Sequence, residues 1–320
     1  MDKLSPYALG ATLYMPATRQ DLLEVVFGQK IIGLRSLVVC LEDAVAELDV
    51  NVALLNLQCL LEAIDAKGGR PVDGPLLFVR PRSSDMAARL NDWPLIRHVD
   101  GFVLPKLGLN NLRAWEQAVA ASHLCLMPTL ETPEVFDPGA MSELRAALLE
   151  SGAERIIALR IGGNDLMGCL GLRRNPRTTL YSTPMSYVIA MLSGIMGSAG
   201  FALTGPVFEQ LDELQLLEEE LALDVAHGLV GKTAIHPLQI PIIHRALQVC
   251  PQDHASARLI LQDEAPAVFQ FNGSMCEPAT HSKWAHAIVE RARWHGVRGD
   301  ALACAIAQET PELRAIRGVA

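Results

Sequence analysis

The chain has 320 residues, of which 50% are hydrophobic and 20% are charged, enough for a large core in one big domain or two smaller ones. Its formal net charge of −9 at pH 7 argues against a general nucleic-acid binder or a protein of anionic membrane surfaces. An anionic substrate therefore needs a local cluster of basic side chains.

Eight short apolar runs, rich in Val, Ile, Leu and Phe, alternate with stretches of helical pattern. These candidate strands lie at residues 11–16, 36–41, 76–80, 101–106, 124–130, 155–161, 200–205 and 232–237. Most of them are continuously apolar, whereas a strand with one solvated face alternates apolar and polar residues. Continuous runs are typical of a parallel sheet that is covered on both faces.

Four longer helices are expected between these strands, at residues 49–69, 134–152, 185–200 and 212–228. Strands that alternate with helices in this way over residues 1–248 predict an α/β fold, a (β/α)8 TIM barrel. An open doubly wound sheet is the alternative. Its glycine-rich phosphate signature is missing, because YMPATR at 14–19 follows the first strand.

Residues 249–320 exceed what a minimal barrel needs, and we expect a C-terminal helical extension there. Its helices are expected at 251–269 and 280–296, on either side of the turn-rich stretch 270–278. We expect this extension to pack on the barrel or on a neighbouring subunit. The apolar barrel helices and the added tail together predict a homo-oligomer.

The seven cysteines are scattered and form no CxxC pair, so free thiols are expected in place of a disulfide or zinc framework. The N-terminal residues lack the hydrophobic core of a signal peptide, and no apolar run approaches the roughly 18 residues of a membrane span. A cytoplasmic protein with no membrane partner is therefore predicted.

Polar side chains follow the predicted strands at the points where they end. They are Glu42, Asp43, Arg80, Arg82, Lys106, Glu131, Asn164, Asp165, Glu209 and His236. In a parallel barrel these ends meet on one face, where barrel active sites are built. One acidic pair after a strand is usually a helix cap or a turn, but repetition at successive strand ends favours a site.

Carboxylates that share a face repel one another unless a positive charge lies between them. Glu131 and Asp165 follow neighbouring strands, and we predict that they share a Mg²⁺ ion, with Glu42 and Asp43 holding its waters. Gly162 and Gly163 would let the backbone approach the bound ligand closely.

Arginines supply the predicted contacts to substrate. Arg80 continues an apolar strand, where an unpaired charge is costly, so we expect it to bind a substrate carboxylate. Its alternative role is an ion pair with Glu42 or Asp43, and both roles can hold in turn. The loop with Arg173, Arg174 and Arg177 either binds a phosphate or carboxylate tail or is simply solvated. His236 is either a site residue or only a hydrogen-bonded histidine.

An ordered set of motifs runs through residues 10–245: YMPATR, CLEDAV, LFVRPR, GFVLPK, LET, GGNDL and GKTAIHPLQI. This set resembles the HpcH/HpaI aldolase and citrate lyase β-subunit superfamily. YMPATR, RIGGNDL and PVFE look most like a branch of C–C bond lyases associated with tellurium-resistance and stress gene clusters. The resemblance implies a Mg²⁺-dependent barrel, commonly a trimer or hexamer, that cleaves or forms a C–C bond beside a carbonyl.

The resemblance also implies residue roles. Glu131 and Asp165 match the metal ligands, and Arg80 matches the arginine that binds the substrate carboxylate or carbonyl oxygen. Glu42 and Asp43 match the acidic pair near the metal's waters. The metal would polarise the carbonyl of a 2-oxo acid or acyl group and stabilise an enolate, while a base removes the proton of the β-hydroxyl. Lys106, at the end of its strand, is counted among the substrate-binding residues.

The chain departs from the family pattern in three places. The usual R-x-N reads Arg80-Pro81-Arg82, and the aspartate pattern of the seventh strand reads GPVFE. In the tail, Glu277 replaces an aspartate that in acyl-CoA lyases of the superfamily reaches a neighbouring subunit's site. A longer carboxylate can still act as an acid or base. These changes put an acyl-CoA substrate in doubt, and Arg82 with the 173–177 loop favours an extra negative charge on the substrate.

The leading hypothesis is a Mg²⁺-dependent C–C lyase or aldolase that acts on a small oxo-acid or acyl compound through an enolate. One alternative keeps the barrel and metal but uses a phosphoenolpyruvate-mutase type of enolate reaction. Another is a non-catalytic barrel that serves as a subunit or binding partner, which the altered tail motif favours. A nucleic-acid partner is excluded by charge and by the absence of basic or aromatic patterning.

Overall fold

The computed structural model describes residues 4–120 and 123–299, so residues 300–320 of the expected extension lie outside the described part. The described part of the chain forms two compact units, one that ends at Ile243 and one that begins at His244. Each unit is described by itself below. None of the described helices is both long and apolar enough to cross a membrane.

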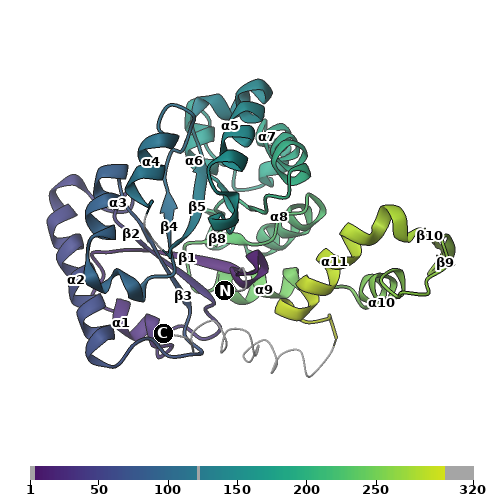
Figure 1. Ribbon diagram of the computed structural model, residues 1–320, viewed down its shortest axis with the longest axis horizontal. Helices are drawn as coiled ribbons and strands as arrows, with labels where there is room; N and C mark the ends of the chain where they lie inside the picture. Colours follow the sequence, from purple (N-terminus) through teal and green to yellow (C-terminus); the bar gives the residue numbers. More distant parts are fainter. Residues whose placement is uncertain (1–3, 121–122, 300–320) are drawn as a thin grey trace. The chain divides into compact units, whose positions relative to one another are not determined.

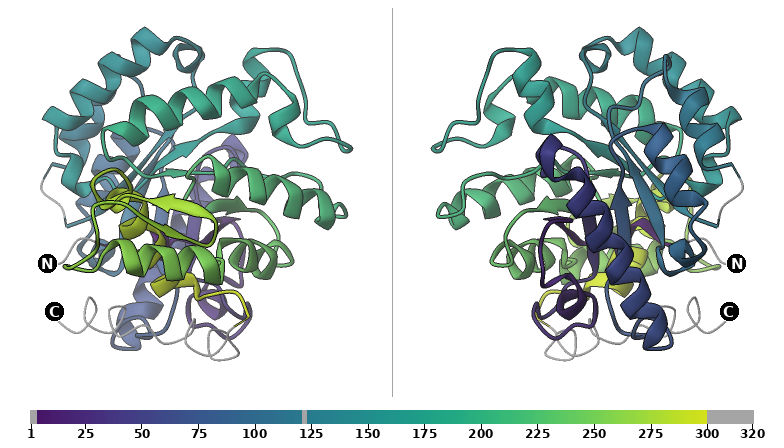
Figure 2. Two further views of the ribbon diagram at one scale, coloured as in Figure 1. Left: turned by 90° about the vertical axis from the view of Figure 1, so that its right-hand side faces the viewer. Right: turned by 90° about the vertical axis from the view of Figure 1, so that its left-hand side faces the viewer.

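Eight parallel strands form the centre of the first unit, with helices outside them (Figures 1 and 2). They are β1 (Ala11–Pro16), β2 (Ser36–Cys40), β3 (Leu76–Arg80), β4 (Gly101–Leu104), β5 (Cys125–Leu130), β6 (Leu159–Ile161), β7 (Leu203–Thr204) and β8 (Lys232–Ala234). Each pairs with the next in the chain, β1 also pairs with β8, and a parallel bridge from Gly205 to Lys232 closes the ring. The predicted (β/α)8 TIM barrel is confirmed, and the open sheet is excluded.

The α-helices of the barrel chain occupy the intervals between strands. They are α1 (Leu22–Val26), α2 (Val50–Ala66), α3 (Ser84–Asn91), α4 (Leu112–Ala118), α5 (Pro138–Glu150), α6 (Gly163–Cys169), α7 (Met185–Leu192), α8 (Leu214–Ala226) and α9 (Gln239–Leu247). The short 3₁₀ turns are η1 (Pro6–Ala8), η2 (Glu47–Asp49), η3 (Pro94–His98), η4 (Pro133–Phe136), η5 (Ala153–Arg155) and η6 (Leu180–Ser182). The expected helix at 185–200 changes at Leu192 into a π-helical turn, η7 (Ser193–Gly197), where two glycines favour irregular winding.

The barrel core consists of the continuous apolar runs. Every residue of β2 and of β3 is buried, as a strand covered on both faces requires. Burial of each large apolar side chain stabilises the fold by roughly 1.5–3 kcal/mol. This core holds the carboxyl ends of the strands in place, so that the loops after them start from fixed positions.

A buried ion network packs between α8 and β8. The Lys232 Nζ lies 2.9 Å from Glu220 Oε1 and 2.7 Å from Asp224 Oδ2. Arg174, from the loop after α6, reaches the same Glu220 at 2.5 Å and 3.1 Å. Burial raises the pKa of Glu220, but Lys232 and Arg174 outweigh it and lower that pKa to about 2. The network joins a loop, a helix and a strand by charge-assisted bonds.

The second unit contains α10 (Pro251–Ile260), an antiparallel hairpin of β9 (Phe269–Phe271) and β10 (Ser274–Cys276), and α11 (Pro278–His295). It begins close to the boundary that the sequence predicts after residue 248. α10 ends at Ile260, earlier than the helix expected at 251–269, and the hairpin occupies the predicted turn-rich stretch 270–278. Its turn, Asn272-Gly273, has φ angles of 49° and 78°, which this residue pair adopts readily.

The outer face of α2 and η2 carries exposed apolar side chains. Leu48, Val52 and Leu55 are 93%, 49% and 61% exposed, and their spacing places them on one side of the helix. An exposed apolar stripe of this kind is typical of subunit contacts. The homo-oligomer that the sequence predicts stays a prediction, and so does its trimeric or hexameric form.

Candidate active site

Arg80 brings three carboxylates together at the carboxyl ends of the barrel strands. It ends β3 opposite Cys40 of β2, and this register places it beside the two acidic residues that follow β2. Its Nη2 lies 2.9 Å from Glu42 Oε2, 2.9 Å from Glu131 Oε1 and 3.5 Å from Asp43 Oδ2. The ion pairs considered from sequence are therefore present, and they also include Glu131.

Lys106 follows β4 and contacts the same carboxylates from the other side. Its Nζ lies 2.8 Å from Glu42 Oε1 and 3.3 Å from Asp43 Oδ1. Its backbone N–H donates to Glu131 Oε1 at 2.8 Å, which requires an unusual left-handed φ of 51°. The Asn111 side chain holds this turn by donating to the Lys106 carbonyl at 2.9 Å. Lys106 thus orients carboxylates, and a direct contact with substrate stays a prediction.

Glu131, directly after β5, is almost fully buried. Its pKa is raised to about 7: burial is the main cause, the charge of Asp165 adds to the rise, and Arg80 opposes it. Asp165 lies in the first turn of α6, after β6, and is therefore close enough to act on Glu131. The four predicted acidic positions share one region of the barrel mouth, and the negative charge around Glu131 favours a cation there.

Gly162 packs directly against Glu131. A Cβ built on Gly162 would lie 2.3 Å from both Cβ and Oε2 of Glu131, and a Cβ on Gly163 would lie 2.7 Å from Pro206 Cβ. Real side chains do not approach so closely. The two glycines are therefore needed because protein atoms, not an open ligand surface, fill the space in front of them. This corrects the expectation that the glycines make room for the ligand itself.

Arg82 has a different environment from the one the sequence suggests. Its Nε donates to the Leu41 carbonyl at 2.9 Å, Nη1 reaches Glu47 at 2.5 Å, and Nη2 donates to the Val45 carbonyl. These bonds hold the loop that carries Glu42 and Asp43. The structure assigns Arg82 to positioning that loop and does not support direct substrate binding.

The basic loop after α6 divides into buried and exposed residues. Arg174 is buried against Glu220 and also donates to the Val207 carbonyl at 2.6 Å, so its charge is neutralised inside the protein. The structure does not support its predicted contact with substrate. Arg173 and Arg177 are exposed, and their binding of an anionic tail stays a prediction.

Three further candidates of the first unit, Asn164, Glu209 and His236, and Glu277 of the second unit make hydrogen bonds with other partners. The Asn164 amide donates to Glu209 Oε1 at 3.1 Å, which links the loops after β6 and β7. His236, after β8, accepts from the Leu238 N–H at 3.3 Å. Glu277 caps α11 in the second unit and accepts from the Thr280 hydroxyl at 3.0 Å. Its predicted role as an acid or base stays a prediction.

Arg160 on β6 is a charged residue that sequence reasoning missed. It is 2% exposed and points into the barrel, because its contacts come from other strands. Its Nη2 donates to Thr233 Oγ1 of β8 at 2.6 Å, and its Cζ lies 5.2 Å from the ring centre of Tyr14 on β1. The signal in the sequence is an arginine inside the apolar run at 155–161.

The donor set fits one kind of metal. Among the described residues, no three His, Cys, Asp or Glu side chains converge as in a site ligated fully by protein. Two carboxylates, Glu131 and Asp165, match a hard cation that keeps several waters and takes substrate oxygens as further ligands. These two residues therefore fit Mg²⁺, as the sequence predicts, and do not fit a structural zinc site.

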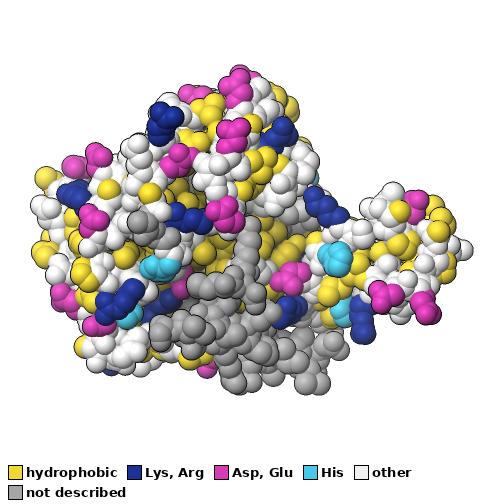
Figure 3. Space-filling model, in the orientation of Figure 1, with side chains coloured by type: hydrophobic (Ala, Val, Ile, Leu, Met, Phe, Trp, Pro, Cys, Tyr) yellow, Lys and Arg dark blue, Asp and Glu magenta, His cyan; other side chains and the backbone are white. Residues whose placement is uncertain are grey.

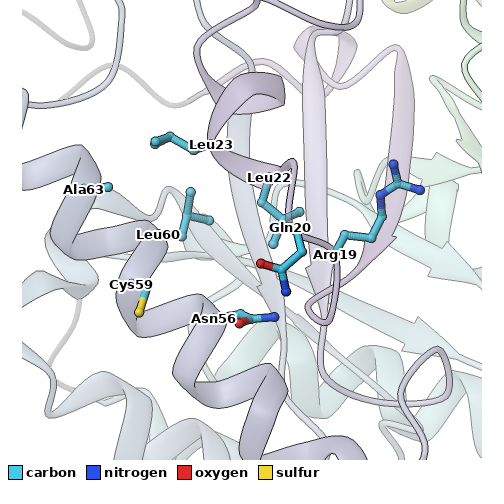
Figure 4. A pocket seen from close by; sticks show the side chains of 8 residues that line it. All are labelled: Arg19, Gln20, Leu22, Leu23, Asn56, Cys59, Leu60 and Ala63. Carbon is cyan, nitrogen blue, oxygen red and sulfur yellow. The ribbon is translucent and has the colours of Figure 1, made fainter.

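A surface pocket between α1 and α2 contains none of these residues (Figure 4). Leu22, Leu23, Leu60 and other apolar groups line it, and the Asn56 amide at its edge donates to the Ala17 carbonyl at 3.1 Å. Acidic and basic side chains are interspersed over the face drawn in Figure 3. The barrel mouth remains the candidate active site.

A family model described as a C–C bond lyase of the TIM-barrel fold matches residues 3–297. No curated protein matches the chain. The fold is similar to CitE from Mycobacterium tuberculosis in complex with magnesium, acetoacetate and coenzyme A, at 22% identity, a TM-score of 0.62, and coverage of 89% of this chain and 99% of that one.

Two further structures are similar. RipC from Yersinia pestis has 19% identity and a TM-score of 0.56, with coverage of 76% of this chain and 96% of that one. The citrate lyase β subunit from M. tuberculosis, complexed with oxaloacetate and magnesium, has 20% identity and a TM-score of 0.56, with coverage of 76% and 99%. At these identities the likeness shows the fold.

Proposed function

Because the chain belongs to the family of C–C bond lyases of the TIM-barrel fold, we propose that it cleaves or forms a C–C bond beside the carbonyl of a small oxo-acid or acyl compound. The observation that carries this proposal is the buried Arg80, placed between Glu42 and Glu131 where the strands end. The similar structures solved with acetoacetate or oxaloacetate support the same substrate class.

We further propose that Glu131 and Asp165 hold a Mg²⁺ ion. The two carboxylates lie near one another and leave a local excess of negative charge that a divalent cation would neutralise. The magnesium in two similar structures supports this choice. When bound, the ion supplies Lewis-acid polarisation of a carbonyl and stabilises the negative charge that develops on cleavage.

Arg80 binds and orients the substrate. Its Nη2 contacts carboxylates, while its buried Nε has no hydrogen-bond partner among the described residues. An unpaired buried donor is costly, and a substrate carboxylate or carbonyl oxygen would supply its acceptor. The Arg80 guanidinium thus fixes the reacting carbonyl relative to Glu131.

Glu42 and Asp43 are the proposed proton acceptors for the substrate's β-hydroxyl, directly or through a water. The backbone N–H of Asp43 donates to Glu42 Oε2 at 2.8 Å, which fixes the Glu42 carboxylate beside Asp43. Lys106 bonds to both carboxylates and fixes the oxygens that receive the proton. Arg82 keeps their loop in place from outside.

Product analysis tests the proposed reaction. Purified protein with Mg²⁺ is incubated with 4-hydroxy-2-oxo acids, citrate, citramalate and their CoA thioesters, and the products are identified by NMR. We expect at least one compound to be cleaved into two fragments in equimolar amounts. We expect Asp165→Asn to form neither fragment. Isomerisation without fragments would instead establish a mutase-type reaction. Binding with no turnover of any compound would favour the non-catalytic barrel.

Substitution of Gly162 tests the position of Glu131. In Gly162→Ala the new Cβ meets Glu131 at 2.3 Å, so the carboxylate must move. We expect Mg²⁺ affinity of the folded variant, measured by calorimetry, to fall roughly 10- to 100-fold. We also expect a lower Tm, because Cβ of Glu131 has to shift together with its carboxylate. Gly194→Ala is the matched control, because nothing lies within 4 Å of a Cβ built there. Unchanged Mg²⁺ affinity in Gly162→Ala would contradict this assignment of Glu131.

A further inference from the structure

Arg160 lies inside the barrel with no acidic partner. Three arginines are buried among the described residues: Arg80, Arg160 and Arg174. Arg80 pairs with Glu42 and Glu131, and Arg174 pairs with Glu220. No described carboxylate lies within ion-pair distance of Arg160; its contacts are a Thr233 hydroxyl, the Tyr14 ring and the Met127 sulfur.

A buried charge of this kind is costly unless something neutralises it. Removing a guanidinium from water costs several kcal/mol, and one neutral hydroxyl and one ring face return only part of that cost. Burial lowers the pKa of Arg160. A guanidinium nevertheless remains charged in proteins. The barrel interior therefore holds a positive charge that no described protein group pairs.

The charge of Arg160 interacts with charged residues of the candidate active site. Arg80 and Glu131 both act on Arg160, the first unfavourably and the second favourably. They also act on Tyr14, the neighbour of Arg160, whose pKa burial raises. Tyr14 and Thr233, the neighbours of Arg160, are only partly buried, whereas Arg160 itself is 2% exposed. Arg160 therefore lies beneath the cluster that we propose holds metal and substrate.

We propose that Arg160, with the Tyr14 and Thr233 hydroxyls, binds a second carboxylate of the substrate, distinct from the group at Arg80. The substrate is then a dicarboxylate: an oxo- or hydroxy-acid, or an acyl compound, with a carboxylate at its far end. Arginine presents two parallel N–H groups that match a carboxylate, and the hydroxyls add donors. This proposal rests on the proposed function and narrows its substrate class.

Matched acids test the proposal by binding alone. Calorimetry in the presence of Mg²⁺ compares the affinity for oxaloacetate with that for 2-oxobutyrate, and the affinity for 2-oxoglutarate with that for 2-oxopentanoate. The two acids of each pair have the same chain length, and only the first carries a second carboxylate. Wild type is expected to bind at least one diacid more tightly than its partner. In Arg160→Met that preference falls about 10- to 100-fold, while the monoacid affinity changes by less than about threefold.

Two further variants separate recognition from folding. Arg155→Met removes a partly buried arginine that donates to the Leu124 and Val119 carbonyls before β6, and it should keep the diacid preference. If Arg160→Met does not fold, Thr233→Val leaves Arg160 in place and should still lower the preference by about threefold to tenfold. An equal loss for both acids of a pair, or no loss, would overturn the proposal.

The two proposals fail in different ways. Cleavage of a substrate with no effect of Arg160→Met on diacid preference would leave the lyase and reject the subsite. Diacid preference that depends on Arg160, with no cleavage of any compound, would leave the subsite and reject the lyase. Wild type with equal affinity for both acids of each pair would also reject the subsite.

Discussion

Replacing Arg80 with methionine is expected to lower kcat/KM for C–C cleavage about 1,000-fold. The substitution removes a buried guanidinium whose donors orient the substrate. Both the bound substrate and the transition state therefore lose stabilising hydrogen bonds. Arg80→Lys keeps the charge but not the planar pair of donors, and should lose roughly 10- to 100-fold. Steady-state kinetics on the substrate found by product analysis measures both effects.

The Mg²⁺ affinity of Arg80→Met distinguishes a loss of substrate binding from general structural damage to the site. Arg80 pairs with Glu42 and Glu131, so its loss removes a cation that competes with Mg²⁺ for those carboxylates. Arg80→Met should therefore bind Mg²⁺ at least as tightly as wild type. The exposed Arg97→Met is the control and should keep full activity. Arg80→Met with near-wild-type kcat/KM would contradict the role of Arg80.

Replacing Lys232 with methionine is expected to lower the free energy of unfolding by about 3–5 kcal/mol. Lys232 is 1% exposed and is the cation that pairs with Asp224, which then keeps only the Tyr181 hydroxyl, at 2.8 Å. Denaturant unfolding followed by circular dichroism measures the loss. Lys283→Met, at an exposed position of α11, is the control and should leave the unfolding midpoint unchanged.

A second substitution tests whether the cost arises from the unpaired acid. Lys232→Met combined with Asp224→Asn removes the charge that the single variant leaves buried, while Glu220 keeps its bond to Arg174. The double variant should therefore be more stable than Lys232→Met alone. A loss below about 1 kcal/mol in the single variant would mean that water reaches this network.

All eight strands of the barrel could be predicted from the sequence, because most of them are continuous apolar runs. Their lengths could not. The run at 155–161 contributes only Leu159–Ile161 to the ladder, and that at 200–205 only Leu203–Thr204. Strand length depends on how far the neighbouring strand runs alongside in register, and a single run does not contain that information.

The hairpin of the second unit shows a different limit. Its strands have three residues each, too short for a clear alternation of apolar and polar positions. The signal present was Asn272-Gly273, a pair that favours the tight turn of a hairpin. We interpreted the surrounding stretch as turn-rich and did not separate it into two strands.

The expectation that residues at the ends of parallel strands meet on one face predicts which acidic residues come together. It does not predict the partners of the arginines. Glu42, Asp43, Arg80 and Glu131 come together because parallel strands end on one face. Arg82 and Arg174 look equally available in sequence, yet both are held by backbone carbonyls and acids far along the chain. Only the folded arrangement shows that their charges are already paired.

Arg160 could have been found from the sequence by the argument that identified Arg80. Both are arginines inside apolar strands, where an unpaired charge is costly. Arg80 is easier to recognise as a site residue because it ends its strand beside other polar residues. Arg160 lies one residue before the end of β6, at Ile161, and its neighbours in sequence are apolar. A search for polar residues at strand ends therefore misses Arg160, although the cost of burying its charge indicates a role for it.

Mg²⁺ binding, measured by calorimetry on wild type, Glu131→Gln and Asp165→Asn, tests the central claim most directly. The account predicts that wild type binds one ion and that each variant loses binding, because each removes one of two carboxylate ligands. Glu134→Gln, three residues beyond Glu131 in η4, is the control and should bind as wild type. Absence of Mg²⁺ binding by wild type, or binding that survives in both ligand variants, would contradict the assigned metal site.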